Sequence, residues 1–130
     1  MTGPTAPGGS AGDELPSTDQ TALDRLRRFG GGKLLGEMIN LFITTAPERI
    51  DAARKGLAAE DIPATEMALH SLKSSSAQLG AMRMQRLSER GENLARGGTL
   101  AGVLELIREL DDEFPRVQSW LERARNTETP

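Results

Sequence analysis

A single histidine, His70, lies in a segment whose residue types could carry out nucleophilic chemistry. Residues 65–83 read TEMALHSLKSSSAQLGAMR, and the chain has no other histidine. Helical spacing places Lys73 one turn beyond His70 on the same face, with Ser74 beside it. A neutral imidazole nitrogen can act as a nucleophile, and a nearby cation favours the neutral form and stabilises an arriving anion. His70 and Lys73 could therefore be a nucleophile and its charge-stabilising neighbour, and spacing alone leaves an ordinary solvated lysine as an equal alternative for Lys73.

The apolar residues around His70 predict which way its side chain points. Leucines and a serine recur at steps of three, four and three, and form a narrow stripe that can face a core: Leu69, Leu72, Ser76 and Leu79. At 3.6 residues per turn, His70 lies about 100° round the helix from Leu69 and about 160° from Leu72. A lone histidine on a helix is more often an ordinary surface or core residue. Here, burial of the leucines predicts an imidazole exposed to solvent.

The segment resembles the signature of the histidine-containing phosphotransfer (HPt) domain family, which runs roughly A-H-x-L-K-G-S-S-x-x-x-G-A. Seven positions agree with that signature: His70, Leu72, Lys73, Ser75, Ser76, Gly80 and Ala81. The chain departs from it at Leu69, where the family usually has alanine, and at Ser74, where it usually has glycine. A looser resemblance extends over residues 34–121, which is most of the part expected to fold.

The resemblance implies a role in two-component signal transduction. In this family the histidine accepts a phosphoryl group from an aspartyl-phosphate of a receiver domain and passes it to a second receiver. By this resemblance His70 is the phosphoacceptor, and Lys73 stabilises the charge of the phosphoryl group. The implied partners are receiver domains of a response regulator or a hybrid histidine kinase. The receiver also supplies the Mg²⁺ ion, so no cofactor is expected on this chain.

Four further residues could contact a partner on the same face. The small side chains of Ser74 and Ser75 would let the active-site loop of a receiver approach closely. Ser74 could also hydrogen-bond the phosphoryl group, or could simply be a tolerated substitute for the family's glycine. Gln78, from the next turn but one, and Arg96, from the neighbouring helix, could reach this face or could be ordinary solvated residues.

Composition excludes several other classes of function. The 130 residues carry a net charge of −3, which argues against a nucleic-acid or anionic-membrane binder. The chain has no cysteine and one histidine, so thiolate and multi-histidine metal sites are not expected. No secretory signal and no apolar run of membrane-spanning length is present. We expect a cytoplasmic monomer.

The sequence also bears on whether the chain could phosphorylate itself. It contains no G-x-x-x-x-G-K-[ST] loop and no other glycine-rich nucleotide loop, so we expect a phosphocarrier without autokinase activity. The alternative is a helical interaction module that binds a receiver or a kinase without phosphotransfer. The pairing of His70 with Lys73 favours phosphotransfer, because binding alone does not need it.

Hydrophobic periodicity predicts the helices that must position these residues. Residues 1–18 are rich in glycine, proline, serine and threonine and are expected to be a disordered tail, followed by a helical domain over 19–125 and a frayed end over 126–130. A short helix should begin near Asp19 and end at the glycines of 30–32. A core helix follows from Leu34, and Pro47 could begin a new helix or kink a longer one.

Three more helices complete the expected domain. The helix that carries His70 should run over 62–79 with Asp61 as its N-cap, and the next over 82–96, where Gly91 could mark a close helix contact. The last helix has an apolar stripe from Leu100 to Leu121 that includes Leu104, with a kink or break expected at Pro115. Periodicity alone predicts an all-α helical bundle. The resemblance implies an antiparallel up-down four-helix bundle with an extra short N-terminal helix.

Overall fold

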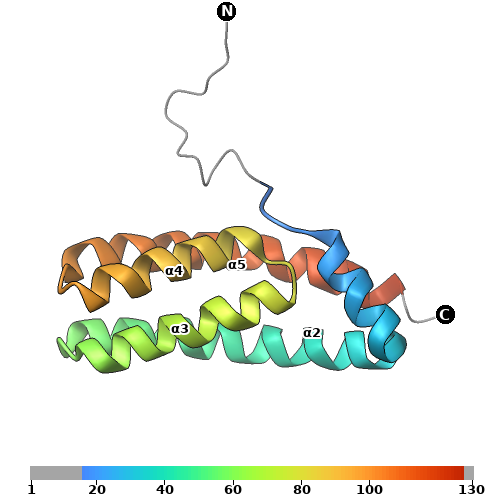
Figure 1. Cartoon of the computed structure of the whole chain (residues 1–130), viewed down its shortest axis with the longest axis horizontal. Coiled ribbons are helices and arrows are strands. Elements are labelled where there is room, and N and C mark those ends of the chain that lie inside the picture. The colour runs from blue at the N-terminus through green and yellow to red at the C-terminus, as the bar shows by residue number, and fades with distance from the viewer. Residues whose placement is uncertain (1–15, 128–130) are drawn as a thin grey trace, which may run out of the picture.

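Four helices account for nearly all of the chain that the structure describes. The computed structural model describes residues 16–127, and contains α2 (Gln20–Ala58), α3 (Ile62–Gln78), α4 (Met82–Arg96) and α5 (Leu100–Thr127). Each of α3 and α5 packs against both α2 and α4, and α3 does not contact α5. The helices lie side by side and are joined by short turns (Figure 1), so neighbours in sequence are antiparallel. The predicted all-α four-helix bundle is confirmed.

A kink divides α2 into two helical parts. Gly31 has a φ of 76° and a ψ of −175°, a conformation that side chains disfavour and glycine adopts readily. The residues before it form a short helix set at an angle to the long part of α2 (Figure 1). The expected short N-terminal helix is therefore present, and the glycine run separates it from the bundle helix.

Both internal prolines lie within continuous helices. Pro47 is inside α2, so it does not begin a new helix, and Pro115 is inside α5. A proline removes one helical hydrogen bond, but α5 continues for three turns beyond it. Val117 and Leu121 in that stretch are fully buried and hold it on the bundle. The break considered at Pro115 is therefore absent.

The core is aliphatic and confirms most of the predicted stripes. The stripe on α3 that was expected to face inward is buried at every position: Leu69, Leu72, Ser76 and Leu79. On α5 the prediction for Leu104 is wrong, because Leu104 is 39% exposed while Leu106 is 3% exposed. The rest of the predicted stripe is confirmed where it is buried, at Val103, Ile107, Leu110, Val117 and Leu121, and Leu106 lies in the core in place of Leu104.

The ends of α3 are fixed by local contacts. Asp61 caps its N-terminus, as predicted, by accepting a hydrogen bond from the backbone N–H of Ala64 at 3.1 Å. After its C-terminus Gly80 has a φ of 76° and its carbonyl accepts a hydrogen bond from the N–H of Asp19 at 2.8 Å. Thr18 forms an isolated antiparallel bridge with Ala81. The segment before α2 thus rests on the α3–α4 turn.

Both expected tails lie largely outside the described residues. Of the tail expected over 1–18, residues 1–15 are not described, and Ser17 accepts a hydrogen bond from the N–H of Arg83 at 3.1 Å. At the other end α5 extends to Thr127, and 128–130 are outside the described range.

The α3–α4 turn yields a test of how much this packing contributes to stability. A Cβ on Gly80 would lie 2.4 Å from the carbonyl oxygen of Asp19, whereas one on Gly98 would meet nothing within 4 Å. Both glycines have positive φ. We expect Gly98→Ala to lower the free energy of unfolding by about 1–2 kcal/mol through backbone strain alone. Gly80→Ala should cost about 3 kcal/mol or more, because overpacking is added. Equal losses in urea unfolding would contradict this account.

Candidate functional site around His70

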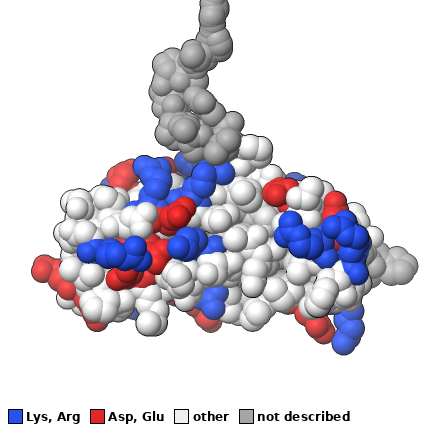
Figure 2. All heavy atoms as spheres, in the orientation of Figure 1, with Lys and Arg blue, Asp and Glu red and all other residues white. Residues whose placement is uncertain are grey.

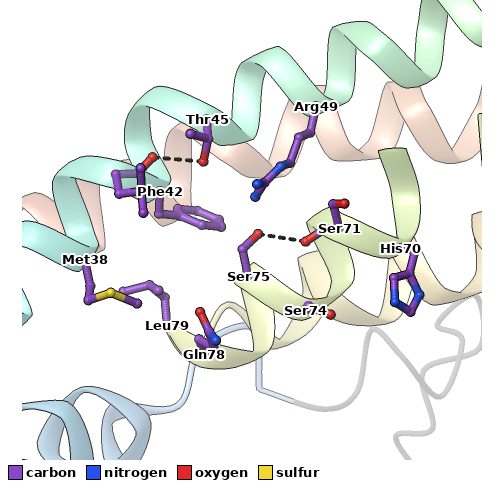
Figure 3. A pocket seen from close by; sticks show the side chains of 11 residues that line it. Met38, Phe42, Thr45, Arg49, His70, Ser71, Ser74, Ser75, Gln78 and Leu79 are labelled. Carbon is purple, nitrogen blue, oxygen red and sulfur yellow. Dashed lines mark hydrogen bonds between the residues drawn. The ribbon is translucent and has the colours of Figure 1, made fainter. Parts of the chain in front are cut away.

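His70 lies midway along α3 with its imidazole directed away from the core. Its side chain is 59% exposed, whereas Leu69 and Leu72 are fully buried. The prediction of an exposed imidazole is therefore confirmed. Figure 3 shows the ring projecting from α3, clear of the side chains drawn on α2.

One nitrogen of His70 is held by a carboxylate from the next helix. The Nδ1 atom lies 2.8 Å from Oε2 of Glu92, which belongs to α4 and is only 3% exposed. An ionised carboxylate can only accept a hydrogen bond, so Nδ1 carries the hydrogen and donates it. In the neutral ring the lone pair is then on Nε2. The contact with Glu92 thus leaves Nε2 as the ring nitrogen with a free lone pair.

Two cations share the same buried carboxylate. Lys73 Nζ lies 2.9 Å from Oε1 of Glu92, and Arg96 Nη2 lies 3.1 Å from Oε2. Burial by itself would raise the pKa of Glu92, but the hydrogen bonds and charges of Lys73 and His70 outweigh it and lower that pKa. Glu92 is therefore ionised at neutral pH.

A second carboxylate extends this cluster on the surface. Arg96 Nε lies 2.6 Å from Oε2 of Glu66, one turn before His70 on α3. In Figure 2 basic and acidic side chains are intermixed over the part of the face formed by α3 and α4. Of the cations named from the sequence, Lys73 and Arg96 therefore come together beside His70, each paired with a carboxylate.

Sequence reasoning missed Glu92, although the sequence contains a signal for it. The inward face of α4 includes Met84, Leu87, Gly91 and Ala95, and Glu92 lies four residues after the buried Ser88 on that face. A charged residue inside such a stripe needs a partner across the helix interface. A Cβ on Gly91 would lie 3.0 Å from Cδ1 of Leu69, so the close helix contact expected at Gly91 is confirmed.

The remaining predicted partner residues lie on the other side of His70, in a groove between α2 and α3. We call this the α2–α3 groove; it is lined from α3 by His70, Ser74, Ser75 and Gln78, and from α2 by Leu41 and Arg49 among others. Ser75 Oγ is 3.2 Å from the carbonyls of both Ser71 and Leu72, so its hydroxyl is used within α3. Ser74 is exposed at the edge of the groove beside His70 (Figure 3).

The described residues offer no other obvious chemistry. Within 16–127 there is no cluster of three or more histidine, cysteine, aspartate or glutamate side chains that could hold a metal ion. In the same range no helix is both long enough and apolar enough to cross a membrane. The arrangement around His70 is thus an exposed and oriented imidazole, a buried anion and two paired cations.

Comparisons with known proteins identify the family of the chain and relatives of its fold. The family described as Hpt domain matches residues 37–120. The structure of histidine-containing phosphotransfer protein B (HptB) from Pseudomonas aeruginosa PAO1 is 25% identical, with 87% of this chain and 97% of that chain covered and a TM-score of 0.81. The HPT domain of a sensor hybrid histidine kinase from Shewanella shares the fold at 20% identity, with 88% and 97% covered and a TM-score of 0.71. No curated protein gave a match.

The buried carboxylate predicts a specific dependence of stability on pH. Because the pKa of Glu92 is lowered in the folded state, its ionised form stabilises the fold, and this contribution is lost as the pH falls below the ordinary value of 4.5. We expect Glu92→Gln to be less stable than wild type by about 1–3 kcal/mol at pH 7, and the difference to shrink between pH 5 and 3. Urea unfolding across this range measures both.

Glu105→Gln is the matched control for that experiment. Glu105 is an exposed carboxylate paired only with Arg108 on its own helix. Its replacement should change stability little at any pH. A Glu92→Gln deficit that stays constant down to pH 3 would contradict the role assigned to the charge.

Proposed function

We propose that His70 is the residue through which this chain, which belongs to the Hpt domain family, carries phosphoryl groups in two-component phosphorelay signalling. One observation above all supports the choice of His70. The imidazole is exposed, while its Nδ1 atom is fixed 2.8 Å from the buried carboxylate of Glu92. The free Nε2 atom is therefore presented to solvent in the protonation state that a nucleophile needs.

The proposed reaction requires no proton transfer to or from His70. The lone pair of Nε2 attacks the phosphorus of an aspartyl-phosphate on a receiver domain. The phosphorus–oxygen bond to the aspartate breaks, and the aspartate carboxylate leaves with the bonding electrons. The ring keeps its hydrogen on Nδ1 and gains positive charge, which the carboxylate of Glu92 stabilises across their hydrogen bond. Glu92 thus acts as a positioning residue for the ring.

Lys73 and Arg96 are proposed to balance the charges of this reaction. Arg96 and His70 contact the same oxygen of Glu92, so the guanidinium and the imidazole are near neighbours. Lys73 is 26% exposed and contacts the other oxygen. Lys73 and Arg96 offset the charges of Glu92 and Glu66, so an incoming phosphoryl group does not meet a net negative cluster beside the ring. Of these two cations, Lys73 is the one that matches the lysine of the family signature.

The partners and the setting of the reaction are also part of the proposal. The chain is a phosphocarrier, and its sequence has no nucleotide loop, so the phosphoryl donor is a receiver domain of a response regulator or hybrid kinase rather than ATP. The receiver would hold the Mg²⁺ ion. Ser74 and Gln78 border the surface such a partner would cover. We propose a monomer acting in the cytoplasm. A module that only binds would have no need for an oriented imidazole.

Replacement of His70 tests the phosphoacceptor directly. Purified receiver domains from the same organism, phosphorylated beforehand, should transfer acid-labile, base-stable phosphate to the wild-type chain. His70→Gln should accept none, and should stay folded with a loss of no more than about 1.5–3 kcal/mol, the range for one hydrogen bond to a charged group. Ser119→Ala, an exposed change on α5, is a control that should leave transfer intact. Phosphate retained by His70→Gln would refute the assignment.

Replacement of Glu92 tests the orientation of the ring. NMR spectra of the phosphorylated chain should place phosphorus on Nε2 and hydrogen on Nδ1. Glu92→Gln should slow transfer from a fixed receiver roughly tenfold, the effect of losing about 1.4 kcal/mol of charge-assisted hydrogen bonding.

Glu66→Gln is the matched control, because it removes the other carboxylate of Arg96 and leaves the contact between His70 and Glu92. Its transfer rate should stay within about twofold of wild type. Phosphorus found on Nδ1, or equal losses in the two variants, would overturn the role of Glu92.

A further inference from the structure

The α2–α3 groove has an electrostatic character that the cluster on the other side of His70 lacks. None of the residues that line the groove is acidic, and apart from His70 its single ionisable side chain is Arg49. Hydroxyl groups and apolar side chains make up the rest. Glu66 and Glu92, by contrast, lie on the α4 side of His70. The groove is therefore a surface with positive charge and no carboxylate to offset it.

Arg49 has no carboxylate partner among the described residues. The positions three and four residues away on α2 are threonine or alanine, so the helix itself offers no acidic neighbour. No ion pair or hydrogen bond of its guanidinium is found within 16–127. One turn further along α2, Arg54 pairs with Asp51 and with Asp111 of α5. Arg49 is half-buried although it has no such partner. The five N–H donors of its guanidinium are therefore available to hydrogen-bond a carboxylate of another protein.

The direction of the Arg49 side chain indicates what kind of partner it could meet. In Figure 3 it extends across the groove toward Ser71 and Ser75, while the ring of His70 projects from α3 further along. It is thus placed beside the reacting atom rather than on it. Leu41, which also lines the groove, is 57% exposed. A groove that offers both an exposed apolar side chain and an arginine has the composition typical of the energetically important part of a protein interface.

We propose that Arg49 is a specificity-determining contact that pairs with a surface carboxylate of the receiver domain docked over His70. This inference rests on the proposed function, and names the residue that selects the partner. A receiver that holds Mg²⁺ beside its aspartyl-phosphate must carry carboxylates around that site, because Mg²⁺ takes oxygen ligands. Lys73 and Arg96 are already paired with Glu92, so Arg49 is the cation near His70 whose charge is available to such a surface.

A pair of charge reversals tests this contact. Arg49→Glu changes the charge inside the groove, and Arg123→Glu makes the same change at an exposed position of α5, which does not touch α3. Initial rates of phosphotransfer are measured against the concentration of the phosphorylated receiver that serves wild type best. For Arg49→Glu we expect the half-saturating concentration to rise about tenfold or more at low salt, with a smaller difference at high salt. The maximal rate should stay within about twofold.

The other variants define which results would overturn the inference. Arg123→Glu should shift the half-saturating concentration less than about twofold, and Arg49→Lys should restore most of the affinity, because it keeps the charge. Equal effects of the two reversals would mean that only net charge matters. Slower labelling of Arg49→Glu by phosphoramidate, which needs no protein partner, would place Arg49 at the phosphoryl group instead. If wild type accepts phosphate from no receiver, the proposed function itself fails.

Discussion

The burial of one carboxylate constrains the arrangement of the whole site. Glu92 is 3% exposed between α3 and α4, and a charge in such a place is stable only when it is paired and hydrogen-bonded. Lys73, His70 and Arg96 meet that requirement together. Each of them is thereby held in a defined position. The hydrogen bond to Glu92 keeps Nδ1 of the imidazole facing the carboxylate, so that Nε2 faces outward. The same pairing that makes Glu92 tolerable in the interface gives the ring its orientation.

The signature around His70 separates into residues proposed to perform chemistry and residues that place them. Ser76 and Ala81 are fully buried, and Gly80 permits the positive φ of the turn and the close approach of Asp19. These positions determine the geometry of the turn that joins α3 to α4. His70 and Lys73 then project from α3 toward Glu92. A match to the signature therefore predicts two features, the turn between α3 and α4 and the placement of the His70 side chain.

Most of the fold could be predicted from local patterns, and the site only in part. Caps, glycines and apolar spacing determined the helix ends and the exposure of His70, since these depend on neighbours in sequence. Glu92 was missed, because a glutamate on a helix is usually exposed, and its place on the inward face of α4 is informative only when a partner across the interface is sought. On α5 the main stripe was predicted correctly, and only one position at its edge was misjudged, for a similar reason. A wide apolar face allows several stripes, and only packing against α2 and α4 selects Leu106 over Leu104.

The hydrogen on Nδ1 also bears on the thermodynamics of the proposed carrier. Because the ring keeps this hydrogen throughout, phosphorylated His70 can release its phosphoryl group and return to a neutral imidazole without waiting for a proton. Neither the formation of the nitrogen–phosphorus bond nor its cleavage by a carboxylate then depends on a proton transfer. The carrier would impose no direction on the flow of phosphate. The direction of phosphoryl transfer would follow from the relative amounts of phosphorylated and free receivers.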